Sequence, residues 1–206
     1  MGLILGKITV ETPKYEVLQS TNEYEIRKYP PSVIAQITYD PSQMKDKKDG
    51  GFSILANYIG VVGKAQNTKA EKVAMTAPVI TQDTGAASAE KIAMTAPVVT
   101  KDGDGEGEAK MVSMQFVLPA KYKTAEDAPK PLDERVVIKE EGEKKYGVVK
   151  FSGVASDVVV KDKVEKLKSA LEKDGVKVVG EYMLARYNPP WTLPPLRTNE
   201  VMIPVE

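Results

Sequence analysis

The chain has 206 residues, enough for one large domain or two small ones, and its 42% hydrophobic and 28% charged residues are typical of a soluble globular protein. Lys plus Arg equal Asp plus Glu at 29 each, so no excess charge favours nucleic acid or anionic lipid. Histidine and cysteine are both absent, which excludes a Ser-His-Asp triad, a thiol nucleophile and a His/Cys zinc site.

The hydropathy of the chain indicates no membrane span or leader. No stretch approaches 18 consecutive apolar residues, the length that a spanning helix needs. The opening MGLILG is too short for the apolar region of a secretory signal and lacks a basic start. Since no cysteine is present to form disulfides, we expect a cytoplasmic protein.

Three short strands are predicted first, at residues 15–19, 24–29 and 33–39, with a break at Pro30-Pro31 between the last two. The alternation within the second strand places three side chains on each face. One face carries Tyr24, Ile26 and Lys28, and the other carries Glu25, Arg27 and Tyr29. We interpret the tyrosines as cross-strand packing residues.

A helix is predicted over about residues 51–61, because apolar side chains recur there at spacings of three and four. They are Phe52, Leu55, Tyr58, Ile59 and Val62. Such a stripe either packs into the core or forms one wall of a ligand cleft, and the spacing alone fits both.

The next segment is duplicated. Residues 71–81 read EKVAMTAPVIT and residues 90–100 read EKIAMTAPVVT, each with the period of two that predicts a half-buried strand. Pro78 and Pro97 cannot donate to a ladder and therefore belong at a strand end, an edge or a bulge. We favour one copy in the sheet and the other in an inserted, flexible region over residues 81–110; a hairpin of both copies is the alternative.

The rest of the chain repeats the pattern of strands, helix and strands. The acidic, glycine-rich residues 101–110 lack EF-hand spacing and indicate a solvated loop. Strands are predicted at 111–118, 135–139, 146–151, 182–187 and 200–205. A helix begins at Ser156 or Asp157 and ends at Gly175, and the proline-rich residues 188–195 form a stiff arm that carries the only tryptophan.

This order predicts an α+β fold in one domain over residues 1–206. We expect two similar halves, about 15–118 and 132–206, packed into one large antiparallel sheet that can curl into a barrel and carries two main helices, because no linker separates the halves.

Several segments together resemble the SOUL/haem-binding protein family. They are YEIRKYPP at 24–31, GGFSILANYIG at 50–60, AMTAPV at 74–79 and again at 93–98, MQFVLP at 114–119, and RYNPPWTLPPLRTNEV at 186–201. The match runs in order over nearly the whole chain, and the doubled MTAPV phrase is similar to plant members. The resemblance implies a distorted antiparallel β-barrel of two pseudo-symmetric halves, each with one helix. It also implies a cytosolic, non-catalytic protein that binds haem or other tetrapyrroles in an apolar cleft.

The resemblance also implies where the ligand lies. In this chain the haem or tetrapyrrole site would consist of Phe52, Leu55, Ala56, Tyr58 and Ile59 on the first helix, with Lys64, and with Lys47 and Lys48, beside it. The tip between Tyr187 and Leu196 would lie nearby. One family branch is proposed to ligate iron through a histidine, but that position is Lys28 here. Haem or protoporphyrin is therefore the expected ligand without a His or Cys bond to iron, and Tyr58, Met75 and Met94 are the remaining iron-ligand candidates.

Two further functions stay open at this point. The same cleft could serve an enzyme acting on a small hydrophobic metabolite, with Lys28, Glu25 and Tyr58 as acid–base groups. The MTAPV duplication and the acidic loop could instead form a docking surface for a protein partner.

Overall fold

The computed structural model describes residues 7–44, 49–61, 63–84 and 111–206. Nine strands and two α-helices are formed in these ranges. In chain order they are β1 (Glu16–Ser20), β2 (Glu25–Tyr29), β3 (Ser32–Tyr39), α1 (Gly50–Ile59), β4 (Val79–Thr84), β5 (Met111–Val117), β6 (Val137–Glu141), β7 (Lys144–Ser152), α2 (Asp157–Lys173), β8 (Met183–Arg186) and β9 (Thr198–Val205). Short 3-10 turns lie at Pro41–Gln43 and Pro194–Leu196.

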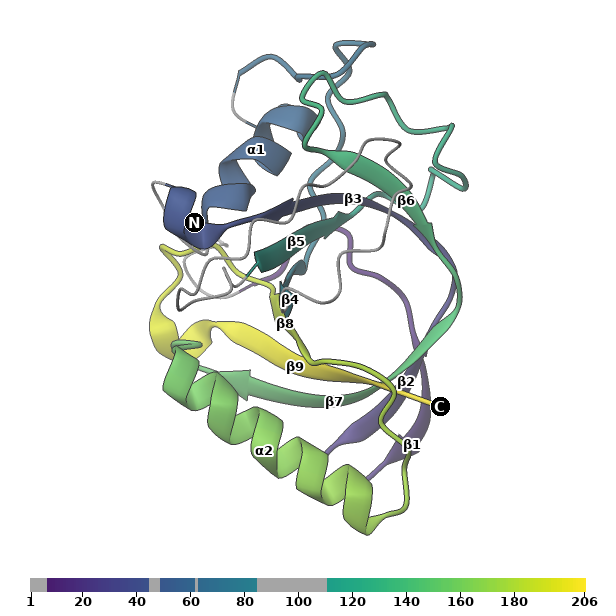
Figure 1. The fold of residues 1–206 in the computed structure, drawn as a ribbon, viewed down its shortest axis with the longest axis vertical. Coiled ribbons are helices and arrows are strands. Elements are labelled where there is room, and N and C mark those ends of the chain that lie inside the picture. Colours follow the sequence, from purple (N-terminus) through teal and green to yellow (C-terminus); the bar gives the residue numbers. More distant parts are fainter. Residues whose placement is uncertain (1–6, 45–48, 62, 85–110) are drawn as a thin grey trace, which may run out of the picture.

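All nine strands belong to one antiparallel sheet in the order β1-β2-β7-β9-β8-β4-β5-β3-β6. The sheet curls strongly, and both helices lie outside the curl, α1 over β3 and β5 and α2 under β7 and β9 (Figure 1). The concave face of the sheet is thus covered by neither helix. The predicted α+β distorted barrel with two main helices is confirmed.

One long hairpin joins the two ends of the sheet. Tyr29 pairs with Lys144 at the end of β2, and Ser32 pairs with Glu141 at the start of β3, so the ladder keeps the same register across Pro30-Pro31. The strands β2 and β3 therefore act as one bent strand, and β6 and β7 act as its partner. On the other side, β4 pairs with β8 and closes the ring.

The layer under α1 contains β4, β5, β3 and β6 around one apolar cluster. Leu55, Tyr58 and Ile59 of α1 pack against Ile37 and Met114 of the sheet. Gly51 allows this close approach, since a Cβ atom there would lie 2.5 Å from Tyr39 Cε1. The helix ends at Gly60, whose φ of 78° is the left-handed conformation that glycine adopts without strain.

The layer under α2 contains β1, β2, β7, β9 and β8. Val160, Val164, Leu167 and Leu171 point from α2 into a cluster with side chains of β2, β8 and β9. As predicted, Ser156 caps the start of α2 with its hydroxyl, and Gly175 follows its end with a φ of 72°.

The first copy of the duplicated phrase supplies a strand to the sheet, but a shorter one than predicted. β4 begins only at Val79, directly after Pro78, so the proline does lie at a strand end. The expected strand character of residues 71–78 is wrong. Thr76 instead bridges to Glu11 in parallel, and Ala77 donates its N–H to the Glu11 carbonyl. The second copy lies outside the described residues.

The two layers do not follow the two halves of the sequence. β1 and β2 from the first half join α2, and β6 from the second half joins α1. The predicted domain boundaries stay a prediction, although residues 81–84 of the expected insertion belong to β4. Within the described ranges, no helix is long and apolar enough to cross a membrane.

Candidate ligand-binding site

The residues predicted to line the site on α1 are mostly sealed into the core. Leu55, Ala56, Tyr58 and Ile59 are at most 2% exposed and belong to the packing beneath the helix. Phe52 is half-buried with its ring edge-on to Phe116, 5.6 Å between centroids, and Lys64 is exposed. Lys47 and Lys48 lie outside the described residues. A ligand beside α1 therefore meets only Phe52 of the five apolar side chains, unless the helix separates from the sheet.

The candidate iron ligands are engaged elsewhere. The Tyr58 hydroxyl donates to the Pro129 carbonyl at 2.8 Å, and burial raises its pKa, which disfavours the tyrosinate form that binds iron. Lys28, at the family's histidine position, forms an ion pair with Glu143 at 3.0 Å. Met75 is packed against the α1 cluster, and Met94 lies outside the described residues.

Around α1, the candidate side chains therefore offer no axial ligand for haem iron and, apart from Phe52, no accessible apolar surface for a tetrapyrrole ring. Among the described residues, no group of three or more carboxylate side chains is close enough to hold a metal ion. Since the sequence contains neither histidine nor cysteine, an imidazole or thiolate bond to iron has no counterpart in this chain.

The three groups considered for acid–base chemistry do not meet. Lys28 and Glu25 are three residues apart on β2 and point to opposite faces of the sheet. Tyr58 is buried under α1, in the other layer. No single substrate could contact all three.

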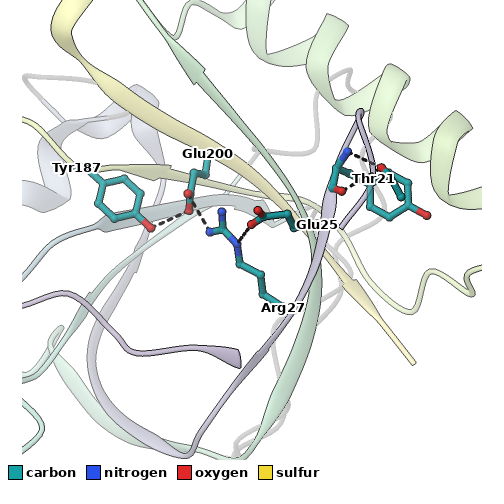
Figure 2. A network of polar contacts seen from close by, with 6 residues as sticks. Thr21, Glu25, Arg27, Tyr187 and Glu200 are labelled. Carbon is teal, nitrogen blue, oxygen red and sulfur yellow. Dashed lines mark hydrogen bonds and ion pairs between the residues drawn. The ribbon is translucent and has the colours of Figure 1, made fainter. Parts of the chain in front are cut away.

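A different set of polar side chains does converge, on the concave face. Arg27 of β2 donates to Glu200 of β9 at 2.9 Å and to Glu25 at 2.7 Å, and Tyr187 donates its hydroxyl to Glu200 at 2.7 Å. Figure 2 shows these four side chains in a row across the inside of the curl. We call Glu25, Arg27, Tyr187 and Glu200 the interior network.

The interior network is deeply buried at its centre and open at its rim. The Arg27 and Glu200 side chains are each 5% exposed, whereas that of Glu25 is 35% exposed. Two carboxylates share one guanidinium, so the network carries excess negative charge when both are ionised. Removing one partner of such a buried pair typically costs about 3–5 kcal/mol of stability, because the other charge is left unpaired.

Aromatic and sulfur-containing side chains surround the interior network. Tyr146, Met183 and Met202 form a buried floor, against which Tyr29 and Tyr187 pack while remaining partly exposed. The Tyr29 ring meets the Tyr146 ring edge-on at 5.7 Å. We call these five residues, with Val148, Ala185 and Ile80, the interior cluster.

One hydroxyl of the interior cluster lacks a well-formed hydrogen bond. The Tyr29 Oη atom is buried and finds no partner of good geometry, although the Arg27 side chain lies close enough to influence its pKa. Burial raises the pKa of Tyr29 to about 12, and the nearby Arg27 side chain opposes part of that rise. An unsatisfied buried hydroxyl typically costs about 1–3 kcal/mol of stability. A ligand atom that accepts a hydrogen bond from this hydroxyl would recover part of that free energy.

Two hollows elsewhere in the described structure do not suit a tetrapyrrole. One, of about 30 Å³ between β4, β8 and the start of α2, has room for about one water molecule. The other, of about 360 Å³, is a shallow depression over the polar face of α2, lined by Glu23, Asp162, Glu165, Lys166 and Lys173 among others.

Comparison with protein families decides the kinship of the chain. The profile of the SOUL heme-binding proteins matches residues 10–204. The chain belongs to the SOUL heme-binding family. This match confirms the resemblance inferred from the sequence motifs and supports heme binding at the level of the family. A search of curated proteins found no significant match.

Solved structures show how widely this SOUL fold occurs. The C-terminal domain of EcmrR is 11% identical with a TM-score of 0.55, over 93% of this chain and 98% of that domain. A hydrolase from Listeria innocua is 12% identical with a TM-score of 0.55, over 92% of this chain and 94% of that chain. At these identities the likeness establishes the fold alone.

Sequence reasoning did not find the interior network of this SOUL protein. The alternation in YEIRKY did place Glu25, Arg27 and Tyr29 on the face opposite Tyr24 and Ile26. What the sequence could not supply was the partner: Glu200 lies 173 residues beyond Arg27. The available signal was Glu200, a charged residue placed directly before the apolar run Val201-Met202-Ile203 of a predicted strand.

Proposed function

We propose that this SOUL protein binds a tetrapyrrole without catalysing its conversion, as a carrier or buffer in the cytosol. The family match over residues 10–204 carries the proposal. The absence of histidine and cysteine from the sequence argues that the ring, rather than its metal, supplies the affinity. A broad flat ligand can bury much apolar surface, which is worth roughly 25 cal/mol per Å².

We further propose that the ring lies against the interior cluster rather than under α1. Tyr29 and Tyr187 offer partly exposed aromatic surface there, and the unpaired Tyr29 hydroxyl offers a hydrogen bond. On α1 only Phe52 offers comparable surface, so the site predicted from the sequence requires the helix to move. Because the interior network carries excess negative charge, ligand carboxylates should point away from it, toward solvent.

Titration of haemin and of metal-free protoporphyrin into the purified protein tests the function. We expect a shift of the Soret band with both ligands and similar affinities, because the sequence has no histidine or cysteine to bond the iron. Haemin binding no tighter than to an unrelated control protein would refute the function.

Two matched variants then locate the site. Tyr29→Phe keeps the ring and removes the unpaired hydroxyl, and should weaken protoporphyrin binding about 3- to 10-fold if the ligand accepts that hydrogen bond. Phe52→Ala removes the accessible ring of α1 and should leave affinity unchanged. The reverse result, with Phe52→Ala weakening binding and Tyr29→Phe not, would return the site to α1.

A further inference from the structure

The arm between β8 and β9 exposes large apolar side chains at one end of the molecule. Trp191 is 66% exposed, Leu193 52% and Leu196 41%. Val154 is 54% exposed and lies in the neighbouring turn, because Ser152 pairs with Thr198 and Asn199 donates to the Gly153 carbonyl. The arm and the start of α2 lie at the same end of the molecule (Figure 1). Large exposed apolar side chains gathered at one end of a molecule are typical of an interaction site.

The arm is held rigid in spite of its exposure. Arg197 donates from Nε to the Thr192 carbonyl at 2.8 Å and from Nη2 to the Pro190 carbonyl. Thr192 is 1% exposed and anchors the middle of the arm, while Trp191 and Leu193 on either side of it point outward. The tip therefore needs little ordering when it binds, which reduces the entropic cost of association.

The backbone of the arm is largely satisfied from within. Prolines occupy positions 189, 190, 194 and 195 and have no N–H to bond. The carbonyls of Pro189, Leu193 and Pro194 accept N–H groups of the arm itself, at 2.9–3.1 Å. A partner protein that adds a strand uses free backbone groups, and these turns provide few. Where the arm enters the apolar part of a bilayer, backbone groups that are already hydrogen-bonded cost less to bury.

The charge distribution of the arm also fits a lipid interface. Residues 188–196 contain no charged side chain, and Arg197 holds a positive charge at the base of the arm. No carboxylate pairs with Arg197 among the described residues. Tryptophan favours the membrane–water interface, where its ring is among lipid chains and its N–H remains near water.

We propose that the arm, with Trp191 at its tip, inserts into the interfacial layer of a phospholipid membrane and docks the protein there reversibly. The net formal charge is zero, so apolar insertion rather than long-range attraction drives the contact. The proposal is independent of tetrapyrrole binding and is tested with ligand-free protein.

The single tryptophan makes the test site-specific. On addition of phosphatidylcholine vesicles, with or without phosphatidylglycerol, Trp191 emission should move to shorter wavelength, and brominated lipid should quench it, at low and at high salt. No change in emission and no co-sedimentation would overturn the proposal. A shift that grows with protein concentration alone would assign the arm to a second copy of the chain, and a shift only with protoporphyrin would assign it to the ligand site.

A variant pair completes the experiment. Trp191→Ala should lower co-sedimentation with vesicles roughly tenfold, since much of the buried apolar surface is lost. Val17→Ala, at another exposed apolar position on β1, is the control and should sediment like the unaltered protein, with circular dichroism confirming that both fold. Equal loss in the two variants, or no loss in Trp191→Ala, would refute insertion of the arm.

Discussion

Two tyrosine hydroxyls on the concave face differ in one respect that can be measured. Tyr187 donates to Glu200, whereas Tyr29 finds no partner of good geometry. Tyr187→Phe should therefore lower the free energy of unfolding by about 1.5–3 kcal/mol, since a hydrogen bond to a charged acceptor is lost. Tyr29→Phe should leave the ligand-free protein within about 0.5 kcal/mol or make it more stable. Urea unfolding followed by circular dichroism distinguishes the two; equal losses would contradict the assignment of Tyr29 as unpaired.

Buried tyrosines should also make stability fall in alkali. Burial raises the pKa of Tyr146 and that of Tyr29 to about 12, compared with about 10 in an unfolded chain. The stabilisation is complete below pH 10, because both states are then protonated. It is lost as the pH rises from 10 through 12, because the unfolded state releases its protons first. Urea midpoints between pH 8 and 12 should show this decline, and Tyr146→Phe should reduce its slope; an unchanged slope in that variant would contradict the prediction.

At the scale of the elements, each helix meets the sheet at a glycine. A Cβ atom at Gly51 would lie 2.5 Å from Tyr39 Cε1 and 3.0 Å from Ile37 Cγ2, and one at Gly147 would lie 2.9 Å from two methyl carbons of Leu171. We predict that Gly51→Ala pushes α1 outward and costs about 1–3 kcal/mol of stability, although alanine is the better helix former.

The control for Gly51→Ala is Gly142→Ala, in the turn between β6 and β7. No atom lies within 4 Å of a Cβ there, so we expect little change. Thermal unfolding measures both variants. If Gly51→Ala were as stable as the control, the contact between α1 and the sheet would be looser than the structure indicates.

The elements themselves could largely be predicted from sequence, because their signals are local. The apolar spacing located α1, and Ser156 and Gly175 located both ends of α2. The failure at residues 71–78 has a physical cause. Thr76 donates its hydroxyl to the Val117 carbonyl, and Ala77 bonds to Glu11, so partners 41 and 66 residues away override the local alternation.

At the scale of the whole molecule, the two layers should unfold together. They are joined by the β4–β8 ladder on one side and by the long hairpin on the other. Leu55 under α1 and Leu171 under α2 are both fully buried in different clusters. Leu55→Ala and Leu171→Ala should each cost about 2–5 kcal/mol and shift one single transition. Hydrogen exchange that released one layer before the other would contradict this coupling.

The barrel and the two helices were predictable from the order of elements, but the exchange of strands between layers was not. Nothing local distinguishes a strand that stays with its own half from one that crosses to the other. The interior network was hidden for the same reason, since Arg27 and Glu200 meet only when β2 and β9 both flank β7. The ligand site on α1 was inferred from the resemblance to the family. Such a resemblance does not show how tightly the helix packs against the sheet in this chain.

The crossing of strands has a consequence for synthesis on the ribosome. β9 is paired on both edges within the α2 layer, and both of its partners, β7 and β8, precede it in the sequence. A nascent chain therefore holds β1, β2, β7 and the apolar face of α2 without β9 until that strand has been synthesised. Chaperones should bind the apolar surface of the chain until β9 has been made, and a chain truncated before β9 should keep that surface exposed and be degraded.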